Sequence, residues 1–149
     1  DPDVPVLRTN MAGTSFSNAV VIGSGFQKVN AIGMIFDNAI LADTDFSGAG
    51  IGGSTFHNTI LAGVSFKDAL LTAVDFDGAI VFDGEFLDKL ESEVAPGTFT
   101  KDRFAIEPVT QEVLASHPNS HHFYRIPPSL IEGKTPYRIK LIRPWKQES

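Results

Sequence analysis

The segment FDNAILADTDFSGAGIGGSTF (residues 36–56) contains the pattern that decides the fold, because a phenylalanine returns in it every ten residues. An aliphatic residue lies midway between consecutive phenylalanines, so the underlying period is five residues. A repeat of fixed period specifies the architecture of a chain before any other signal. We expect the core repeat centres to be Phe16, Phe26, Phe36, Phe46, Phe56, Phe66, Phe76 and Phe86.

A period of five excludes one continuous helix or strand. Residues ten apart move around the axis of an α-helix, and residues five apart point to opposite faces of a β-strand. The chain must therefore turn once in every five residues. Glycine supports this interpretation, because it readily adopts the positive φ of tight turns. Five glycines share one phase of the repeat: Gly13, Gly23, Gly33, Gly53 and Gly63.

A second column of residues lies two positions before each centre and carries no charge, as at Thr14, Ala39 and Ser54. The remaining three positions of each five hold nearly all the charged residues and asparagines in the repeat. Two inward and three outward positions, followed by a corner, describe one side of a square coil. Four such sides close a coil of twenty residues.

The pattern resembles that of the pentapeptide-repeat proteins over roughly residues 14–85, and Val6 and Met11 fit an earlier start. The segments AILADTDFSGAG and NTILAGVSFKDA carry the Leu or Phe centre of that family's motif. The resemblance implies an all-β fold, a right-handed quadrilateral β-helix of about four coils, with neighbouring coils about 4.8 Å apart. It says little about activity, because function resides in sites rather than in folds.

The C-terminal part of the sequence loses the period. We predict two parts, a β-helix over residues 1–95 and a C-terminal cap over residues 96–149. Within the cap, residues 107–116 are predicted to form a short helix with Pro108 in its first turn, and residues 137–143 a strand. A solenoid end exposes core side chains and unpaired strand edges, so a cap is required there.

One side of the expected coil is apolar on its outside as well as its inside. A contiguous apolar stripe is seldom left in contact with water. We expect either that the C-terminal segment covers the stripe, or that the stripe is an interface with another molecule. That molecule would be an unidentified protein partner or a second copy of the chain. A homo-oligomer could form through the apolar stripe or through the C-terminal segment. The residues expected to form this interface are Val20, Ile22, Ile40, Ile60, Ile80 and Phe82.

Charge is distributed unevenly along the chain. Residues 1–95 hold thirteen acidic and four basic residues (net −9), whereas residues 96–149 hold five and eight (net +3), which gives the total of −6. The acidic part argues against direct nucleic-acid binding, because phosphates are repelled. The chain has no cysteine and no apolar run of the roughly 20 residues that a membrane helix needs. The compartment stays open: a soluble protein, either cytoplasmic or exported after processing.

The sequence contains few residues with catalytic or metal-binding character. His117, His121 and His122 cluster without a partner motif, and Asp75 and Asp77 flank a phenylalanine on the outside of the coil. We therefore expect no enzyme activity, no cofactor and no metal. Asparagines at a spacing of twenty are expected to stack as a ladder at one corner: Asn18, Asn38 and Asn58.

These observations favour a noncatalytic protein–protein interaction or scaffolding module built on a rigid β-solenoid. The alternative comes from the resemblance. Some pentapeptide-repeat proteins mimic duplex DNA through their width and negative charge and act on type II topoisomerases such as gyrase. The net charge of −9 over residues 1–95 is compatible with that function. The chain is equally compatible with being one domain of a larger protein.

Overall fold

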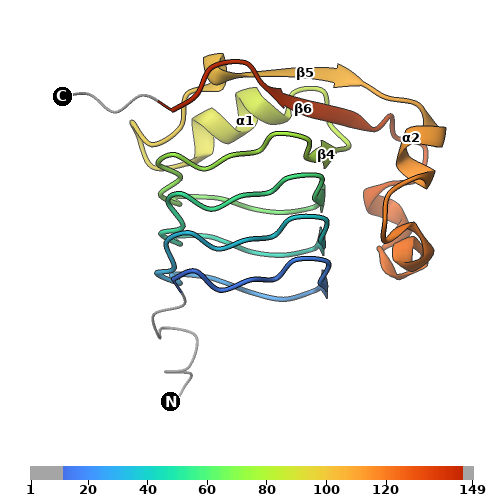
Figure 1. The fold of residues 1–149 in the computed structure, drawn as a ribbon, viewed down its shortest axis with the longest axis horizontal. Helices are drawn as coiled ribbons and strands as arrows, with labels where there is room; N and C mark the ends of the chain where they lie inside the picture. Colours follow the sequence, from blue (N-terminus) through green and yellow to red (C-terminus); the bar gives the residue numbers. More distant parts are fainter. Residues whose placement is uncertain (1–11, 146–149) are drawn as a thin grey trace.

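The computed structural model describes residues 12–145, and residues 12–81 form a stack of four-sided turns, here called the coil (Figure 1). Four short parallel strands stack along one side of it, each offset from the next by twenty residues, as where Leu41 lies opposite Leu61. Isolated parallel bridges with the same offset join the other sides. The quadrilateral β-helix expected from the sequence is confirmed, whereas Val6 and Met11 lie outside the described residues. The four strands are β1 (Val20–Ile22), β2 (Ile40–Ala42), β3 (Ile60–Ala62) and β4 (Ile80–Val81).

Two columns of phenylalanine fill the inside of the coil. Within a column the rings stack face to face, as at Phe36 and Phe56, whose centroids are 5.0 Å apart, and at Phe46 and Phe66, at 5.2 Å. Rings of different columns meet edge to face, as at Phe36 and Phe46, with planes at 88°. The stacking distance is close to the separation of paired strands, so each ring contacts the next along the whole stack. The fully buried rings are Phe36, Phe46, Phe56, Phe66 and Phe76.

The repeat ends earlier than the sequence suggests. Phe86 is predicted as a repeat centre, but it is the first residue of a helix, α1 (Phe86–Glu93), so this prediction is wrong. Helix α1 lies where the next turn of the coil would continue. The Asp68 N–H donates to the Glu93 carbonyl at the end of α1, whereas the equivalent Gly48 N–H donates to Lys67 of the next turn. The Phe86 ring still meets the Phe76 ring edge to face at 6.3 Å.

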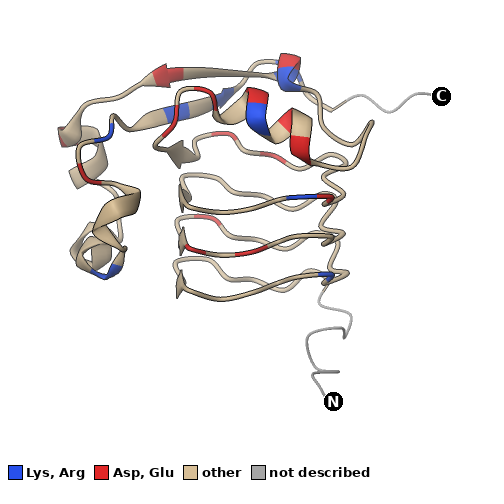
Figure 2. Ribbon diagram, turned by 180° about the vertical axis from the view of Figure 1, so that it is seen from behind, with Lys and Arg blue, Asp and Glu red and all other residues tan. Residues whose placement is uncertain are grey.

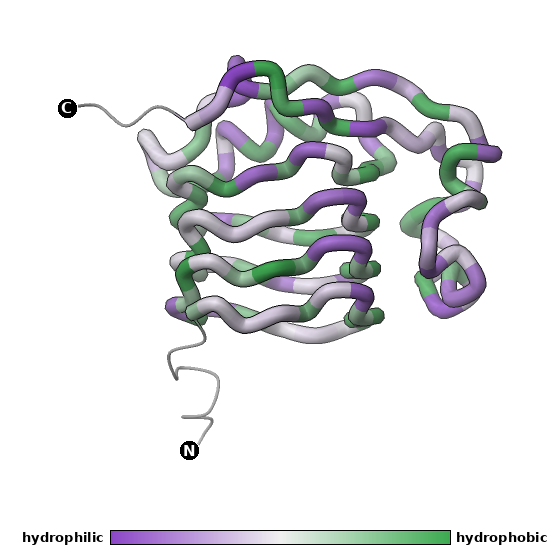
Figure 3. The backbone as a smooth tube through the Cα atoms, in the orientation of Figure 1, coloured by the Kyte–Doolittle hydropathy of each residue, from purple (hydrophilic) through white to green (hydrophobic). Residues whose placement is uncertain are grey.

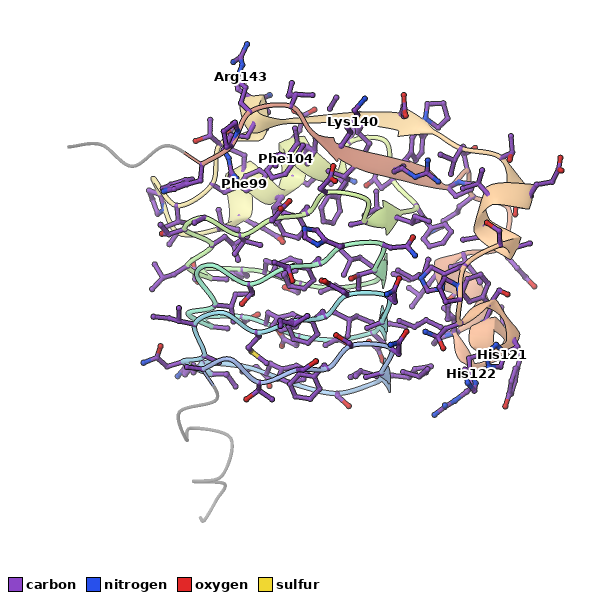
Figure 4. The ribbon with its side chains drawn as sticks, viewed as in Figure 1. Phe99, Phe104, His121, His122, Lys140 and Arg143 are labelled. Atoms are coloured by element: carbon purple, nitrogen blue, oxygen red, sulfur yellow. The ribbon has the colours of Figure 1, made fainter. Side chains whose placement is uncertain are left out.

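A β-hairpin closes the same end of the coil. Strand β6 (Tyr137–Leu141) pairs antiparallel with β4 and with β5 (Phe104–Pro108), so the sheet order is β1-β2-β3-β4-β6-β5. A short 3-10 turn, η2 (Lys101–Arg103), precedes β5. Beneath the hairpin, the stacked rings of Phe99 and Phe104 each meet Phe76 edge to face, at 6.1 and 6.0 Å (Figure 4). The last phenylalanine of the coil is therefore covered by aromatic rings of the cap.

Residues 110–135 form a separate excursion between the two strands of the hairpin, here called the lobe. It contains α2 (Gln111–Ala115) and two 3-10 turns, η3 (Ser120–Arg125) and η4 (Pro128–Leu130). The Val109 N–H donates to the Pro136 carbonyl, so the lobe leaves and rejoins the hairpin at adjacent positions. In Figure 1 the lobe hangs beside the coil, next to strands β1–β4.

The predicted helix at residues 107–116 is only partly correct. Residues up to Pro108 belong to β5, and α2 begins at Gln111 after Thr110, whose side chain accepts the Val113 N–H at 3.2 Å. Pro108 is therefore the last residue of a strand and not part of the first helical turn. The predicted strand at residues 137–143 corresponds to β6.

Candidate interaction surfaces

The apolar outer side of strands β1–β4, here called the covered face, lies under the lobe. Its central residues Ile40, Ile60 and Ile80 are fully buried, and they form one cluster with Leu114 and Ile126 of the lobe. Figure 3 shows the hydrophobic colour at this corner of each turn, opposite the lobe. Partly buried side chains complete the cluster: Val20, Ile22 and Phe82 from the strand side, and Phe123, Leu130 and Ile131 from the lobe.

This arrangement corrects the expected interface. Ile40, Ile60 and Ile80 contact the protein's own lobe and have no surface left for a second molecule. Val20, Ile22 and Phe82 keep part of their surface. The physical reason is that the lobe brings its own leucine, isoleucine and phenylalanine side chains to the face. Of the two alternatives that the sequence leaves open, the structure shows coverage by the C-terminal segment.

Two hydrogen bonds join the lobe to the coil among the described residues. The Nε2 atom of His117 lies 2.7 Å from the Asn58 carbonyl, and Nδ2 of Asn119 donates to the Asn38 carbonyl at 2.7 Å. Asn38 and Asn58 occupy equivalent corners of consecutive turns. The lobe therefore binds two backbone carbonyls that are one coil apart.

Asparagine at these corners has a structural cause. Asn38 and Asn58 adopt φ values of 64° and 55°, in the left-handed region where asparagine is tolerated better than most residues. Their side chains also bond to each other, because Asn58 Nδ2 donates to Asn38 Oδ1 at 2.9 Å. The expected asparagine ladder thus has one observed rung, between Asn38 and Asn58, at the corner that the lobe contacts. Asn18 shares the conformation, with φ of 65°.

His117 is the histidine that the sequence analysis places in a cluster, and its ring is buried between the lobe and the coil. It is 4% exposed, and its Nδ1 accepts the Asn119 backbone N–H at 3.0 Å. Burial disfavours the charged ring and lowers the pKa of His117, although the Asn58 carbonyl partly opposes this shift. Since a carbonyl only accepts hydrogen bonds, the neutral ring carries its proton on Nε2.

The other two histidines of that cluster lie elsewhere. Figure 4 shows His121 and His122 at the lower end of the lobe, and their ring centroids are 4.1 Å apart. Within residues 12–145, no group of three histidine, cysteine or carboxylate side chains is placed to hold a metal ion. No helix in that range is long and apolar enough to cross a membrane.

Aspartates and one histidine form a ladder on the outside of the side built on Phe36, Phe56 and Phe76. His57 lies between Asp37 of the preceding turn, at 3.4 Å from Nδ1, and Asp75 of the following turn, at 2.9 Å from Nε2. Partial burial opposes the charge on His57, but the hydrogen bond to Asp75 and the neighbouring carboxylates outweigh it and raise its pKa. Figure 2 shows acidic residues along the turns of the coil and basic residues on the hairpin.

Asp75 and Asp77, the pair considered for catalysis, serve structural roles here. Asp75 accepts the Asp77 backbone N–H at 2.8 Å, and Asp77 accepts the Leu141 N–H of the hairpin at 2.7 Å. Asp77 thereby ties the cap to the last turn of the coil. Asp75 binds His57 through its other oxygen.

A second side of the coil carries no charged residue and is left uncovered by the described parts of the chain, and sequence analysis missed it. This open face consists of residues 30–33, 50–53 and 70–73, none of which is charged. Ile32 is 63% exposed and Leu70 is 50% exposed, so both are among the few large hydrophobic side chains that lie open on the described surface. The sequence does contain a signal for this face. Ile32 and Leu70 occupy outward positions of the repeat, and the equivalent positions of the turn between them are glycines, Gly52 and Gly50.

Comparison with known proteins supports the repeat assignment. The family model described as pentapeptide repeats, with eight copies, matches residues 24–61 and 51–81. A search of curated proteins found no match. A search of solved structures found a pentapeptide repeat protein from the Arabidopsis thaliana thylakoid lumen, with 21% identity and a TM-score of 0.28, covering 67% of this chain and 90% of that one.

That TM-score is too low to establish a shared arrangement, so the assignment rests on the family match and on the geometry of the coil. The matched residues are those that form the stacked four-sided turns. Residues 24–81 match the pentapeptide-repeat model, and the coil has the geometry that such repeats predict.

Proposed function

We propose that the protein is a noncatalytic interaction module that binds a protein partner through the open face of its coil. The observation that carries this proposal is the exposure of Ile32 and Leu70 on a flat side without charged residues. The covered face is occupied by the lobe, so the open face is the apolar side of the coil that remains free for a partner.

The shape of the open face supports docking of an apolar, charge-poor surface. Glycine leaves the middle turn low, and the Leu70 side chain lies over it, with Cδ1 3.7 Å from where a Cβ at Gly50 would be. Ile32 approaches Gly53 in the same way, at 4.0 Å from its Cβ position. Two exposed aliphatic side chains thus lie on a backbone that inter-turn hydrogen bonds hold in place. A preformed surface loses little entropy on binding.

Site-specific photo-crosslinking in the source cell tests this proposal. A photoreactive phenylalanine analogue placed at Ile32 is expected to give a discrete protein adduct. The matched control carries the same analogue at Gln27, an exposed residue on a different side of the coil. Adducts of the same mass and yield from both positions, or none from Ile32, would contradict docking on the open face. A variant with Leu70→Lys should abolish the adduct at position 32 while keeping the fold.

The acidic DNA mimic acting on a type II topoisomerase stays the alternative prediction. Its feature is the acidic ladder, in which Asp37 and Asp75 share His57. A gyrase supercoiling assay with the protein in large excess separates the two functions, because only the mimic is expected to inhibit it.

A further inference from the structure

The lobe and the hairpin are attached to the coil in different ways. The hairpin continues the sheet, with backbone bonds such as Ile139 N–H to the Ala79 carbonyl at 2.8 Å and Gly78 N–H to the Ile139 carbonyl at 2.7 Å. The lobe has side-chain packing and only the two hydrogen bonds of His117 and Asn119 to coil carbonyls among the described residues. Because the lobe leaves and rejoins the hairpin at adjacent positions, it can move off the coil while the cap stays in place.

Both of these hydrogen bonds depend on His117, one directly and the other through Asn119. The neutral ring donates from Nε2 to Asn58 and accepts at Nδ1 from the backbone N–H of Asn119. A second proton on the ring must go to Nδ1, because Nε2 already carries one. The charged ring then presents an N–H to the Asn119 N–H and loses that bond. Asn119 is also the residue whose side chain holds the Asn38 carbonyl, so losing the bond to Nδ1 disturbs that contact, whereas Nε2 keeps its bond to the Asn58 carbonyl.

Among the contacts of the ring, only the Asn58 carbonyl favours a positive charge, and burial outweighs it. The coil presents the Asn58 carbonyl, and the lobe presents the Asn119 N–H and the Phe123 ring, whose centroid lies 5.8 Å away. His57 precedes Asn58 in the chain, but its side chain is directed at Asp37 and Asp75 on another side of the coil. No carboxylate, lysine or arginine of residues 12–145 has a recorded interaction with His117.

We propose that the lobe is a pH-controlled lid, and that protonation of His117 releases it and exposes the covered face. The lid lies on a different side of the coil from the open face, so this inference is independent of the proposed function. The residues that would be uncovered are the apolar ones of β2 and β3, around Ile40 and Ile60.

The direction of the effect follows from the contacts. The closed lid binds the neutral ring, so closure is complete above the ordinary histidine pKa of about 6.5 and weakens as the pH falls below it. It stops weakening once the pH is below the lowered pKa that His117 has in the closed state. Each unit between the two pKa values shifts the ratio of open to closed molecules about tenfold.

Thiol labelling in the otherwise cysteine-free chain tests the lid. Three variants each carry a single cysteine, which replaces Ala42 on the covered face, Ser54 inside the coil or Ser17 on its exposed surface. The labelling rate of each buried cysteine is divided by the labelling rate of Ser17→Cys at the same pH. From about pH 8 to about pH 5 we expect the normalised Ala42→Cys rate to rise about tenfold. The Ser54→Cys rate should stay low, because the coil remains folded.

Two variants separate this mechanism from general acid sensitivity. His117→Gln keeps a donor and an acceptor but cannot be protonated, so the Ala42→Cys rate should stay low at acid pH. The matched control, His121→Gln with His122→Gln, should open like the unmodified chain. The proposal is overturned if the rate does not change with pH, if His117→Gln opens equally, or if the Ser54→Cys rate rises in parallel. Should His117→Gln fail to fold, the pH profiles of the two buried cysteines still decide the question.

Discussion

The coil and the lobe are both packed through apolar side chains, but they obtain order in different ways. In the coil each turn repeats the one below, and backbone hydrogen bonds and stacked rings connect every turn to its neighbours. The lobe has no repeat, makes one layer of contacts and shares only two hydrogen bonds with the coil among the described residues. A repeating pattern therefore fixes the coil, and a few specific contacts fix the lobe.

The two histidines that bridge neighbouring parts of the molecule show the same contrast. His57 joins three turns of the coil and is stabilised in its charged form by Asp75 and Asp37. His117 joins the lobe to the coil and is stabilised in its neutral form by burial. Acidification therefore strengthens a contact within the coil and weakens the contact that holds the lobe.

The largest expected effect is the loss of a stacked ring. Phe46→Ala should lower the free energy of unfolding by about 3–5 kcal/mol, because the rings above and below are held by the backbone and cannot fill the cavity. Leu114→Ala in the lobe should cost about 2 kcal/mol, at the low end for a buried leucine, since the lobe can settle into the space. Urea denaturation followed by circular dichroism measures both. Equal losses would show that coil and lobe form one equally rigid unit.

The next largest loss of stability is expected from a pair of lysines introduced on the covered face, compared with a pair on the open face. Ile40→Lys with Ile60→Lys should cost about 3 kcal/mol, because two ammonium groups under the lobe have no partner and force it away. The matched pair on the open face, Ile32→Lys with Leu70→Lys, should change stability by no more than about 0.5 kcal/mol. Thermal melts and light scattering check this prediction. A change of molecular mass without loss of stability in the first variant would show that the covered face is an interface between molecules.

The pH dependence of stability distinguishes the two histidines. Because the folded pKa of His57 is raised, its contribution is complete below about pH 6.5 and is lost as the pH rises through the folded value. We expect the difference in melting temperature between the unmodified chain and His57→Gln to shrink from about pH 6 to about pH 9. The partly exposed site limits the effect to under about 1 kcal/mol. His117→Gln should show the opposite trend, and the same sign for both would refute the contrast.

The coil could be predicted from the sequence because its rule is local and repeats. The spacing of Phe36 and Phe46 alone predicts the core, and the identity of the residues at the outward positions has little influence on that prediction. The prediction failed where the repeat gives way to other packing, at Phe86. There, Leu87 and Leu90 follow helical spacing and bury one side of α1 against the core, and Val94 is buried just after the helix ends. A phenylalanine in phase with the repeat concealed that change of period.

The position of the lobe could not be decided from the sequence. The apolar stripe around Ile40 and Ile60 indicates that something covers it, but the covering side chains Leu114 and Ile126 are far away in the chain. Their segment has no periodic pattern that would relate it to the coil. The contacts of His117 and Asn119 are to backbone carbonyls, which are the same for every sequence and leave no signal in residue identity.

The smallest expected effect concerns the corner that the lobe recognises. Asn58→Gly keeps the positive φ and removes only the side-chain bond to Asn38, so it should cost about 0.5–1 kcal/mol. Asn58→Ala loses the same bond and also strains the left-handed backbone, which adds about 1 kcal/mol. Chemical denaturation of both variants measures the two parts separately. Glycine already occupies the equivalent corner of the next turn, where Gly78 has φ of 83°.

If Asn58→Gly proves as stable as the unmodified chain, the side-chain rung adds nothing to the coil. The corner would then matter only because it directs the Asn58 carbonyl at His117. In that case Asn58→Ala, by straining the backbone, should raise labelling beneath the lobe at neutral pH, whereas Asn58→Gly should not. Equal labelling in both variants would mean that apolar packing, and not the geometry of the corner, holds the lobe in place.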